Sequence, residues 1–232
     1  SPEGVETARQ FYYGGYRGTR KVALDYGFEI EGTGNHRIQV LAADGSVQFR
    51  RLDQLTLGET VVVYANQQVF GAAGQSLPLY HGEFQTNSKL VQFPPRMTED
   101  LAFFLGCLTA EGAITANGVN ICNNDPALLA RLDDICQQTF GLRGVISADK
   151  RNHVHYLQVN SRPLRNWLLA DLGLGAGAEN KIIPLCILRA AKAEIAAFLR
   201  GLCLDSYMTL DGKLFGITLA SRKLIRQLQT VL

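Results

Sequence analysis

Glu111 is the side chain whose position most directly suggests metal chemistry. It lies at the end of Leu105-Gly-Cys-Leu-Thr-Ala-Glu-Gly112, which closes a segment with apolar residues at helical spacing. A carboxylate near a helix C-terminus opposes the helix dipole and needs a compensating partner. Two carboxylates held together can bind divalent metal ions and activate a water for phosphodiester cleavage. We therefore expect Glu111 to be a metal ligand, the alternative being a solvated carboxylate at a helix end.

The segment that ends at Glu111 has a second copy further along the chain. Phe103-Phe-Leu-Gly106 aligns with Phe198-Leu-Arg-Gly201, and helical patterns surround both. A glycine inside a helix costs roughly 1 kcal/mol against alanine, so its recurrence predicts that another backbone comes close to it. We expect Gly106 and Gly201 to face each other in a pair of helices whose C-terminal ends lie together.

The second copy differs from the first where its acid is expected. Ser206 is the fifth residue after Gly201, and Asp205 comes one residue earlier. On a regular helix that shift rotates the Asp205 carboxylate by about 100°. A serine hydroxyl is a far poorer Mg²⁺ ligand than a carboxylate. Either the helix end is distorted enough to bring Asp205 into the metal site, or the site has lost one of its two acids and cleavage is impaired or absent.

The elements that would position these residues follow a repeated plan from residue 97 onward. Thr98 suits an N-cap, Asn117-Gly118 is a strong hairpin signal, and Asp125-Pro126 can cap and open a helix. In chain order we expect a helix over 99–110, a hairpin over 113–122, a helix over 126–140, a second hairpin over 144–159 and a helix over 163–172. The same order of a helix, a hairpin and a capped helix begins again after residue 190, with Asp211-Gly212 as the turn of the hairpin. This repetition predicts an αββαββα unit followed by a truncated second copy.

Residues 19–69 have a different pattern. Short segments that alternate apolar and polar residues are separated by turns such as Asp25-Tyr-Gly27 and Asp44-Gly45, which is typical of an antiparallel β domain. Residues 70–96 are expected to be a connection, because Pro94-Pro95 cannot continue a helix or a strand. The predicted fold class is therefore multidomain. An all-β portion over 1–96 precedes an α+β domain over 97–232, with repeats at about 97–190 and 191–232.

Both glycine-bearing helices resemble the LAGLIDADG motif of homing endonucleases, and the resemblance covers about residues 97–232. It implies the family's αββαββα fold, a sheet that lies along double-stranded DNA, and Mg²⁺ held by acids at the two helix ends. Glu111 takes the position of the catalytic acid and metal ligand, with Asp205 as the candidate in the second copy. Asn180-Lys-Ile-Ile-Pro184 is similar to the K-x-x-P stretch of inteins. Lys181 is thus a candidate charge stabiliser, an ordinary exposed lysine being the alternative.

Glu31-Gly-Thr-Gly-Asn-His-Arg-Ile38 resembles the T-x-x-H block of Hint domains, which inteins share with Hedgehog autoprocessing domains. The resemblance extends over residues 8–65 and implies that His36, supported by Thr33, promotes the acyl shift at the scissile peptide. An imidazole suits this role because it titrates near neutrality and can relay the proton of the amide. A polar loop histidine is the alternative. Since a suitable first-residue context and a C-terminal His-Asn are missing, we expect an intein that is incomplete at both ends and cannot splice alone.

Together these resemblances predict an intein-encoded, Mg²⁺-dependent DNA endonuclease fused to part of a protein-splicing domain. The expected partners are double-stranded DNA and the host protein, whose flanking segments are the exteins, and the expected state is a monomer. A first alternative is a non-catalytic DNA-binding protein on a decayed LAGLIDADG scaffold, which Ser206 favours. A second is a structural remnant, favoured by the formal net charge of only +2, since nucleic-acid-binding domains commonly carry a basic patch.

Composition sets the outer bounds. With 47% hydrophobic residues and seven prolines in 232 residues, the chain is neither collagen-like, mucin-like nor disordered. No apolar run approaches the roughly 18 residues of a membrane span, and the first ten residues carry no export-signal pattern. The five cysteines form no C-x-x-C pair, so we expect small buried hydrophobes rather than disulfides or a zinc site. We expect an intracellular, cytoplasmic protein without membrane contact.

Overall fold

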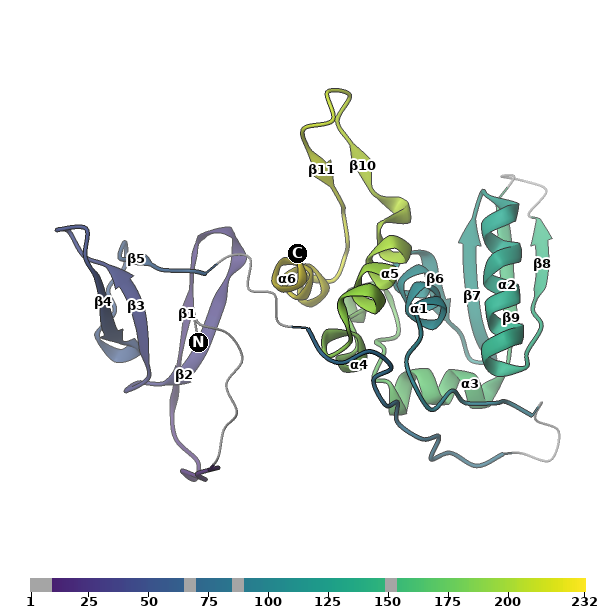
Figure 1. Cartoon of the computed structure of the whole chain (residues 1–232), viewed down its shortest axis with the longest axis horizontal. Helices are drawn as coiled ribbons and strands as arrows, with labels where there is room; N and C mark the ends of the chain where they lie inside the picture. The colour runs from purple at the N-terminus through teal and green to yellow at the C-terminus, as the bar shows by residue number, and fades with distance from the viewer. Residues whose placement is uncertain (1–9, 65–69, 85–89, 149–153) are drawn as a thin grey trace. The chain divides into compact units, whose positions relative to one another are not determined.

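The structure, a computed structural model, describes residues 10–64, 70–84, 90–148 and 154–232 (Figure 1). It combines small antiparallel sheets with helices, and the chain divides into two compact units between Val69 and Phe70. The multidomain α+β character expected from the sequence is therefore present. No helix in the described ranges combines the length and apolarity needed to cross a membrane.

The first unit is built from strands. β1 (Thr19–Ala23) pairs antiparallel with β2 (Glu29–Thr33), while β3 (Arg37–Leu41) lies between β4 (Val47–Arg51) and β5 (Thr60–Val61) in a second antiparallel sheet. Two short 3-10 turns, η1 (Asp25–Gly27) and η2 (Leu52–Gln54), complete it. Its buried apolar side chains in the described ranges are Ile38, Val40 and Leu52. The unit is thus all-β with a small core.

The second unit begins with a segment that was expected to be a connection. In residues 70–96 the Gly71 N–H donates to the Ala190 carbonyl at 2.9 Å, and the Gln92 N–H donates to the Phe140 carbonyl at 3.0 Å. The indole Nε1 of Trp167 donates to the Pro78 carbonyl at 3.0 Å. The units therefore divide upstream of the boundary predicted near residue 96. Prolines exclude regular elements, but they leave an extended segment free to pack on a neighbouring core.

The first repeat of the second unit follows the predicted order. Its elements are α1 (Glu99–Glu111), β6 (Gly112–Ile114), β7 (Gly118–Asn123), α2 (Pro126–Phe140), β8 (Val145–Ala148), β9 (His155–Asn160) and α3 (Arg162–Asn166). The Thr98 side chain accepts from the Leu101 N–H at 3.2 Å and the Asp125 side chain accepts from the Ala127 N–H at 2.9 Å, so both helices are capped. Gly141 ends α2 at φ 69°, a left-handed conformation that favours glycine.

The helix predicted over 163–172 is not one regular α-helix. α3 ends at Asn166 and is continued by a π-helical turn, η3 (Trp167–Asp171), in which the Leu172 N–H donates to the Trp167 carbonyl. Trp167 is fully buried, with its ring 5.9 Å from Phe140 and 5.4 Å from Phe93. The wider turn accompanies this large buried side chain, whose effect on local helix geometry a spacing pattern does not predict.

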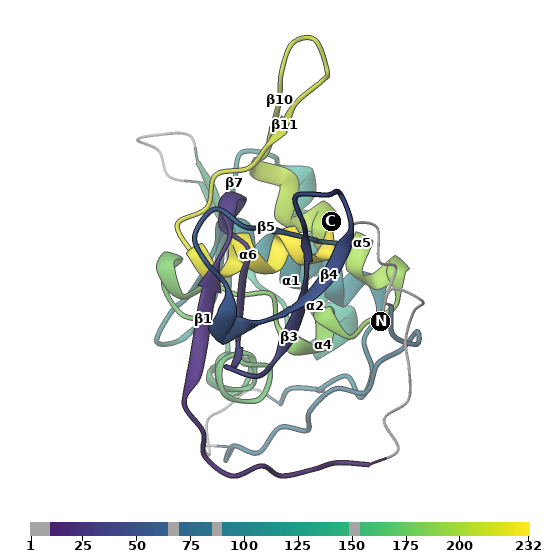
Figure 2. The same ribbon diagram turned by 90° about the vertical axis from the view of Figure 1, so that its left-hand side faces the viewer.

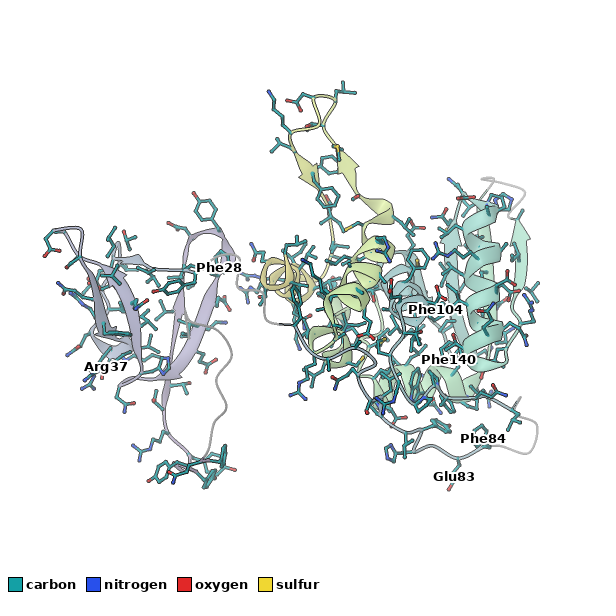
Figure 3. All side chains as sticks on the ribbon, in the orientation of Figure 1. Phe28, Arg37, Glu83, Phe84, Phe104 and Phe140 are labelled. Carbon is teal, nitrogen blue, oxygen red and sulfur yellow. The ribbon has the colours of Figure 1, made fainter. Side chains whose placement is uncertain are left out.

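The four strands of the first repeat form one antiparallel sheet in the order β6-β7-β9-β8. One face buries apolar side chains, Val119 and Ile121 from β7 and Leu157 and Val159 from β9, against α1 and α2 (Figure 1). Alternate positions lie on the opposite face, because successive side chains of a strand point to opposite sides. The side chains of Phe104 and Phe140 extend the core at 5.9 Å between ring centres (Figure 3).

The second repeat is shorter. Two short helices, η4 (Ala178–Asn180) and α4 (Leu185–Leu188), lead into α5 (Lys192–Leu202), which is followed by η5 (Cys203–Asp205), the two-residue strands β10 (Tyr207–Met208) and β11 (Phe215–Gly216), and α6 (Arg222–Val231). Gly212 takes φ 67° in the predicted turn. In both views the β10–β11 hairpin projects from the rest of its unit (Figure 2).

Candidate functional site

The site is built on the contact between α1 and α5, which lie side by side (Figures 1 and 2). A Cβ added to Gly106 would lie 2.1 Å from the carbonyl oxygen of Phe198, and one added to Gly201 would lie 2.4 Å from the carbonyl oxygen of Phe103. Neither position can hold a larger residue without moving a backbone. The close approach expected from the recurring glycine is therefore present.

This contact is reciprocal. Phe198 precedes Gly201 by three residues, as Phe103 precedes Gly106, so each glycine meets the equivalent carbonyl of the other helix. The residue after each glycine takes part in the same way. A Cβ added to Gly106 would approach the backbone nitrogen of Leu202, and a Cβ added to Gly201 would approach the backbone nitrogen of Cys107. Equivalent residues exchanging equivalent contacts define a local twofold relation between the two helices. Such a relation brings the two helix C-termini together.

Glu111 is the last residue of α1 and is half-buried. Its carboxylate Oε2 accepts a hydrogen bond from Nδ2 of Asn123 at 2.9 Å. The Oδ1 atom of the same Asn123 accepts from the Asp125 N–H at 2.8 Å, which ties the amide to the beginning of α2. Asn123 therefore orients Glu111 from a rigid position, as outer residues do for the ligands of metal sites.

Lys181 lies beside the same helix end. Its Nζ donates to the Ala110 carbonyl at 2.9 Å, where a cation is favourable because the carbonyls of the last helical turn lack partners. Burial lowers the pKa of Lys181 below its usual value, and the charge of Glu111 opposes that shift. The alternative of an ordinary exposed lysine does not describe this half-buried ammonium. It places one positive charge next to the Glu111 carboxylate.

The end of α5 differs in shape from the end of α1. α5 stops at Leu202 and the backbone tightens into the 3-10 turn η5, after which the Ser206 N–H donates to the Cys203 carbonyl at 3.0 Å. From Gly106 to Glu111, five ideal α-helical steps advance about 7.5 Å along the axis. From Gly201 to Asp205, one α step and three 3-10 steps of about 2.0 Å advance about the same 7.5 Å.

The tighter turn also changes the rotation at the Asp205 backbone. Each of the three 3-10 steps turns the backbone by about 120° instead of 100°. Together they recover about 60° of the rotation that is lost because Asp205 comes one residue earlier after its glycine than Glu111 does. The backbone of Asp205 therefore comes close to the place that an acid five residues after the glycine would have on a regular helix. This is the kind of helix-end distortion that one of the two sequence-based alternatives requires. The side chain of Asp205 lies outside the part of the chain that the structure describes.

The described side chains include no group of three or more His, Cys, Asp or Glu placed to hold a metal ion. Mg²⁺ differs from zinc in this respect, because it usually keeps several waters and takes only one or two protein carboxylates. A pair formed by Glu111 and one acid from the end of α5 fits that preference. Of this pair, the structure describes the Glu111 carboxylate, which is already oriented as a metal ligand would be.

Two thiols near Glu111 take no part as ligands in their protonated form. Burial, followed by the charge of Glu111, raises the pKa of Cys107 to about 12, and the same two causes raise the pKa of Cys122. Only a deprotonated thiol ligates a metal. All five cysteines are free and buried or half-buried, as expected for small apolar residues.

A cavity of about 290 Å³ adjoins this helix end. Its walls come from the last turn of α1, the start of β6, the 174–178 loop and Lys181, with Leu108, Thr109 and Gly112 among the lining residues. The cavity gives solvent access to the side of the α1 end on which Lys181 lies. No local signal in the sequence predicts it, because it depends on how the 174–178 loop folds back.

The open face of the sheet carries a row of polar side chains that was not predicted from the sequence. Asn120 on β7 lies opposite Gln158 on β9, with Tyr156 and Asn160 two residues to either side on the same strand. The Oδ1 atom of Asn120 is buried, and within the described residues it has no hydrogen-bond partner. Strand alternation around the buried Val119 and Ile121 was the available signal for this row.

Thr33 and His36 lie in the other unit, in the tight turn between β2 and β3. The His36 N–H donates to the Thr33 carbonyl at 2.9 Å, and the Thr33 hydroxyl donates to Oδ1 of Asn35 at 2.7 Å. On the other side of the turn the Leu52 N–H donates to the His36 carbonyl. The backbone of the turn is thus fixed, while the His36 side chain is exposed. The turn brings the two predicted residues together, and it leaves the imidazole accessible.

Comparison with known proteins yields a partial similarity. No family model matches the chain. It is 28% identical over 130 residues to the A subunit of the A-type ATP synthase of Pyrococcus abyssi (strain GE5 / Orsay), a match that covers 55% of this chain. The chain spans only 12% of that protein's length.

Proposed function

We propose that this chain is an intein-derived LAGLIDADG-type DNA endonuclease joined to part of a Hint splicing domain. The observation that carries the proposal is the reciprocal packing of Gly106 and Gly201 against the opposite helix backbone. It supports the twofold helix pair on which such a nuclease centre would be built. A match confined to 12% of a longer protein is also compatible with an element carried inside a host protein.

In the proposed centre, Glu111 and the acid at the end of α5, Asp205, would hold Mg²⁺. The bound ion would supply Lewis-acid activation of a water and of the scissile phosphate. Asn123 holds the Glu111 carboxylate in place through the 2.9 Å hydrogen bond. Lys181, fixed on the Ala110 carbonyl, places its positive charge where negative charge develops on the phosphate.

Double-stranded DNA is the proposed substrate, and the open sheet face is its proposed binding surface. The row of Asn120, Tyr156, Gln158 and Asn160 offers amide donors and acceptors at alternate strand positions. Amides of this kind can make paired hydrogen bonds with base edges in the major groove. The side chains of Gln158 and Asn160 are exposed, so their amides are accessible to a ligand on this face.

The test begins with duplexes selected from a randomised library by binding in EDTA. Addition of Mg²⁺ is expected to produce double-strand cleavage of a selected duplex. Glu111→Gln should slow cleavage by at least about 100-fold while binding persists, because loss of a metal ligand exceeds the 10–100-fold effect typical of outer-shell changes. Asn123→Ala should fall within that smaller range.

Glu99→Gln is the matched control, because Glu99 is an exposed acid at the other end of α1. It is expected to cleave at the rate of the unsubstituted chain. Efficient cleavage by Glu111→Gln would contradict the proposed centre.

A non-catalytic DNA-binding protein is the second candidate, and Ser206 at the expected acid position favours it. It predicts selection of specific duplexes in EDTA with no cleavage in Mg²⁺ or Mn²⁺. In that case Ser206→Asp, which restores a carboxylate at the fifth position after Gly201, is the variant in which to look for recovered cleavage.

The proposed role of the first unit is assistance to an acyl shift. His36 would relay the amide proton and Thr33 would support it, on the turn that fixes both backbones. The host protein segments joined to the element are the proposed substrate. Because this half does not depend on the helix pair, either half of the proposal can fail without the other.

A further inference from the structure

Residues 11–20, Phe-Tyr-Tyr-Gly-Gly-Tyr-Arg-Gly-Thr-Arg, form a feature that the proposed nuclease and splicing roles do not use. We name them the aromatic segment. Their four rings are largely exposed: Phe11 is 93% exposed, Tyr12 88%, Tyr13 71% and Tyr16 103%. Three of the eight tyrosines of the chain lie within these positions. Large rings are normally among the side chains that contribute most to a core or an interface, so this density in solvent indicates a binding role.

The segment contains a defined turn rather than a uniform extended run. Gly15 has φ 74°, a conformation that favours glycine, and Nε of Arg17 donates to the Gly14 carbonyl at 3.1 Å. The turn separates Tyr12 and Tyr13 from Tyr16. It leads directly into β1, which is held by β2 (Figure 1). The rings therefore lie in the segment that immediately precedes β1.

The charge of the aromatic segment is purely positive. The sequence between Gln10 and Leu24 contains no acidic residue. Among the described residues, neither Arg17 nor Arg20 forms an ion pair with a carboxylate, whereas the neighbouring Lys21 pairs with Glu29 at 2.8 Å. Two guanidinium groups thus follow the four aromatic rings in the sequence, and glycines separate these residues.

We propose that the aromatic segment binds single-stranded nucleic acid. Bases stack on the exposed rings, which every base can do because every base has a flat π face. Arg17 and Arg20 contact the phosphates, which their planar guanidinium groups suit. In a duplex the bases stay stacked on one another, so their π faces are not available to the rings. The ligand that suits this segment is therefore a single strand. This activity belongs to the first unit and stands independently of the proposed nuclease.

The test is fluorescence anisotropy with labelled dT20, rU20 and a 20-base-pair duplex, at low salt in EDTA, on the whole chain. The expected result is binding of one or both single strands, with quenching of tyrosine fluorescence. Combined Tyr12→Ser, Tyr13→Ser and Tyr16→Ser should weaken binding at least tenfold, since each stacked ring contributes on that scale. Arg17→Gln should reduce the salt slope by about 0.7, the value per phosphate contact of a single strand.

The matched control is Tyr207→Ser with Phe215→Ser, which removes two exposed rings from the β10–β11 hairpin of the other unit. Its affinity should equal that of the unsubstituted chain. Single-strand binding that survives in the triple tyrosine variant would overturn the proposal. So would a duplex affinity that falls in that variant by the same factor as the single-strand affinity. Self-association that the triple variant abolishes, in a chain that binds no single strand, would overturn it in favour of a protein partner.

Discussion

The two units differ most in how much apolar surface each one buries. The second unit has one continuous core that includes Phe104, Phe140 and Trp167, whereas the buried apolar residues described in the first unit are Ile38, Val40 and Leu52. A cleft of about 950 Å³ opens among β1, η1 and β5 of the first unit. Small sheets with few buried side chains have little stability of their own. The helix pair therefore has a rigid support, while the Thr33–His36 turn is held mainly by backbone hydrogen bonds.

The largest expected effect comes from filling the helix contact. Gly106→Val would place a branched side chain where a Cβ already lies 2.1 Å from the Phe198 carbonyl. We expect a loss of at least about 4 kcal/mol, at the extreme of single substitutions, and unfolding of the second unit with the first unit unchanged. Loss of near-ultraviolet circular dichroism from Trp167, the single tryptophan, reports it. Gly18→Ala, whose added Cβ meets nothing within 4 Å, is the control. Native packing of Gly106→Val would refute the contact.

Removing one phenylalanine ring from each unit compares a buried ring of the second unit with a mostly exposed ring of the first. Phe104→Ala removes a fully buried ring and is expected to lower the free energy of unfolding of the second unit by about 3–5 kcal/mol. Phe49→Ala removes a ring of β4 that is 67% exposed and should cost less than about 0.5 kcal/mol. Urea unfolding followed by tryptophan fluorescence and far-ultraviolet circular dichroism provides both values. Equal losses would contradict the contrast between the units.

The half-buried Lys181 gives the second unit a pH dependence. Its folded-state pKa is lowered, so between that value and its ordinary 10.5 the unfolded chain binds one proton more than the folded chain. The contribution of Lys181 to the stability of the second unit should therefore rise with pH across this window. Above pH 9 the buried cysteines contribute in the opposite direction, because burial raises their pKa values. Glu111→Gln removes the charge that opposes the shift and should extend the window to lower pH. Urea titrations from pH 7 to 10 test this, and the Lys181 contribution should vanish in Lys181→Met.

The smallest effect is expected from His36→Ala. His36 is exposed and its hydrogen bonds in the turn are made by the backbone, so the change in stability should stay within about 0.5 kcal/mol. DNA binding by the second unit should not change. A parallel loss of DNA binding would mean that the two units act as one, and the contrast between a supported helix pair and a separate turn would no longer hold.

The features of the fold that the sequence predicted correctly depend on short-range signals. Thr98 and Asp125 cap the helices that they were expected to cap, and the recurring glycine predicted the backbone contact between α1 and α5. Each of these features depends on a residue type with a specific backbone or capping preference. Such preferences act over a few residues and can be recognised in a single sequence.

The features that were missed depend on long-range packing. Residues 70–96 join the second unit through hydrogen bonds to Ala190 and Phe140, residues that lie far from them in the sequence. The role of Asn123 follows from the hairpin register, in which Gly112 pairs with Ile121 and the neighbouring residues bring Asn123 near Glu111. Counting outward from Asn117-Gly118 would have located it. The π-helical turn at Trp167 had no comparable signal.

The pairing of α1 with α5 also has a consequence for biosynthesis. Residue 106 leaves the ribosome about 95 residues before its partner, a delay of roughly 5–20 s at typical elongation rates. Throughout that interval the flat, glycine-bearing side of α1 has nothing to pack against in the nascent chain. Chaperone capture of translation intermediates should accordingly peak between the emergence of the two helices and decline once the later one is complete.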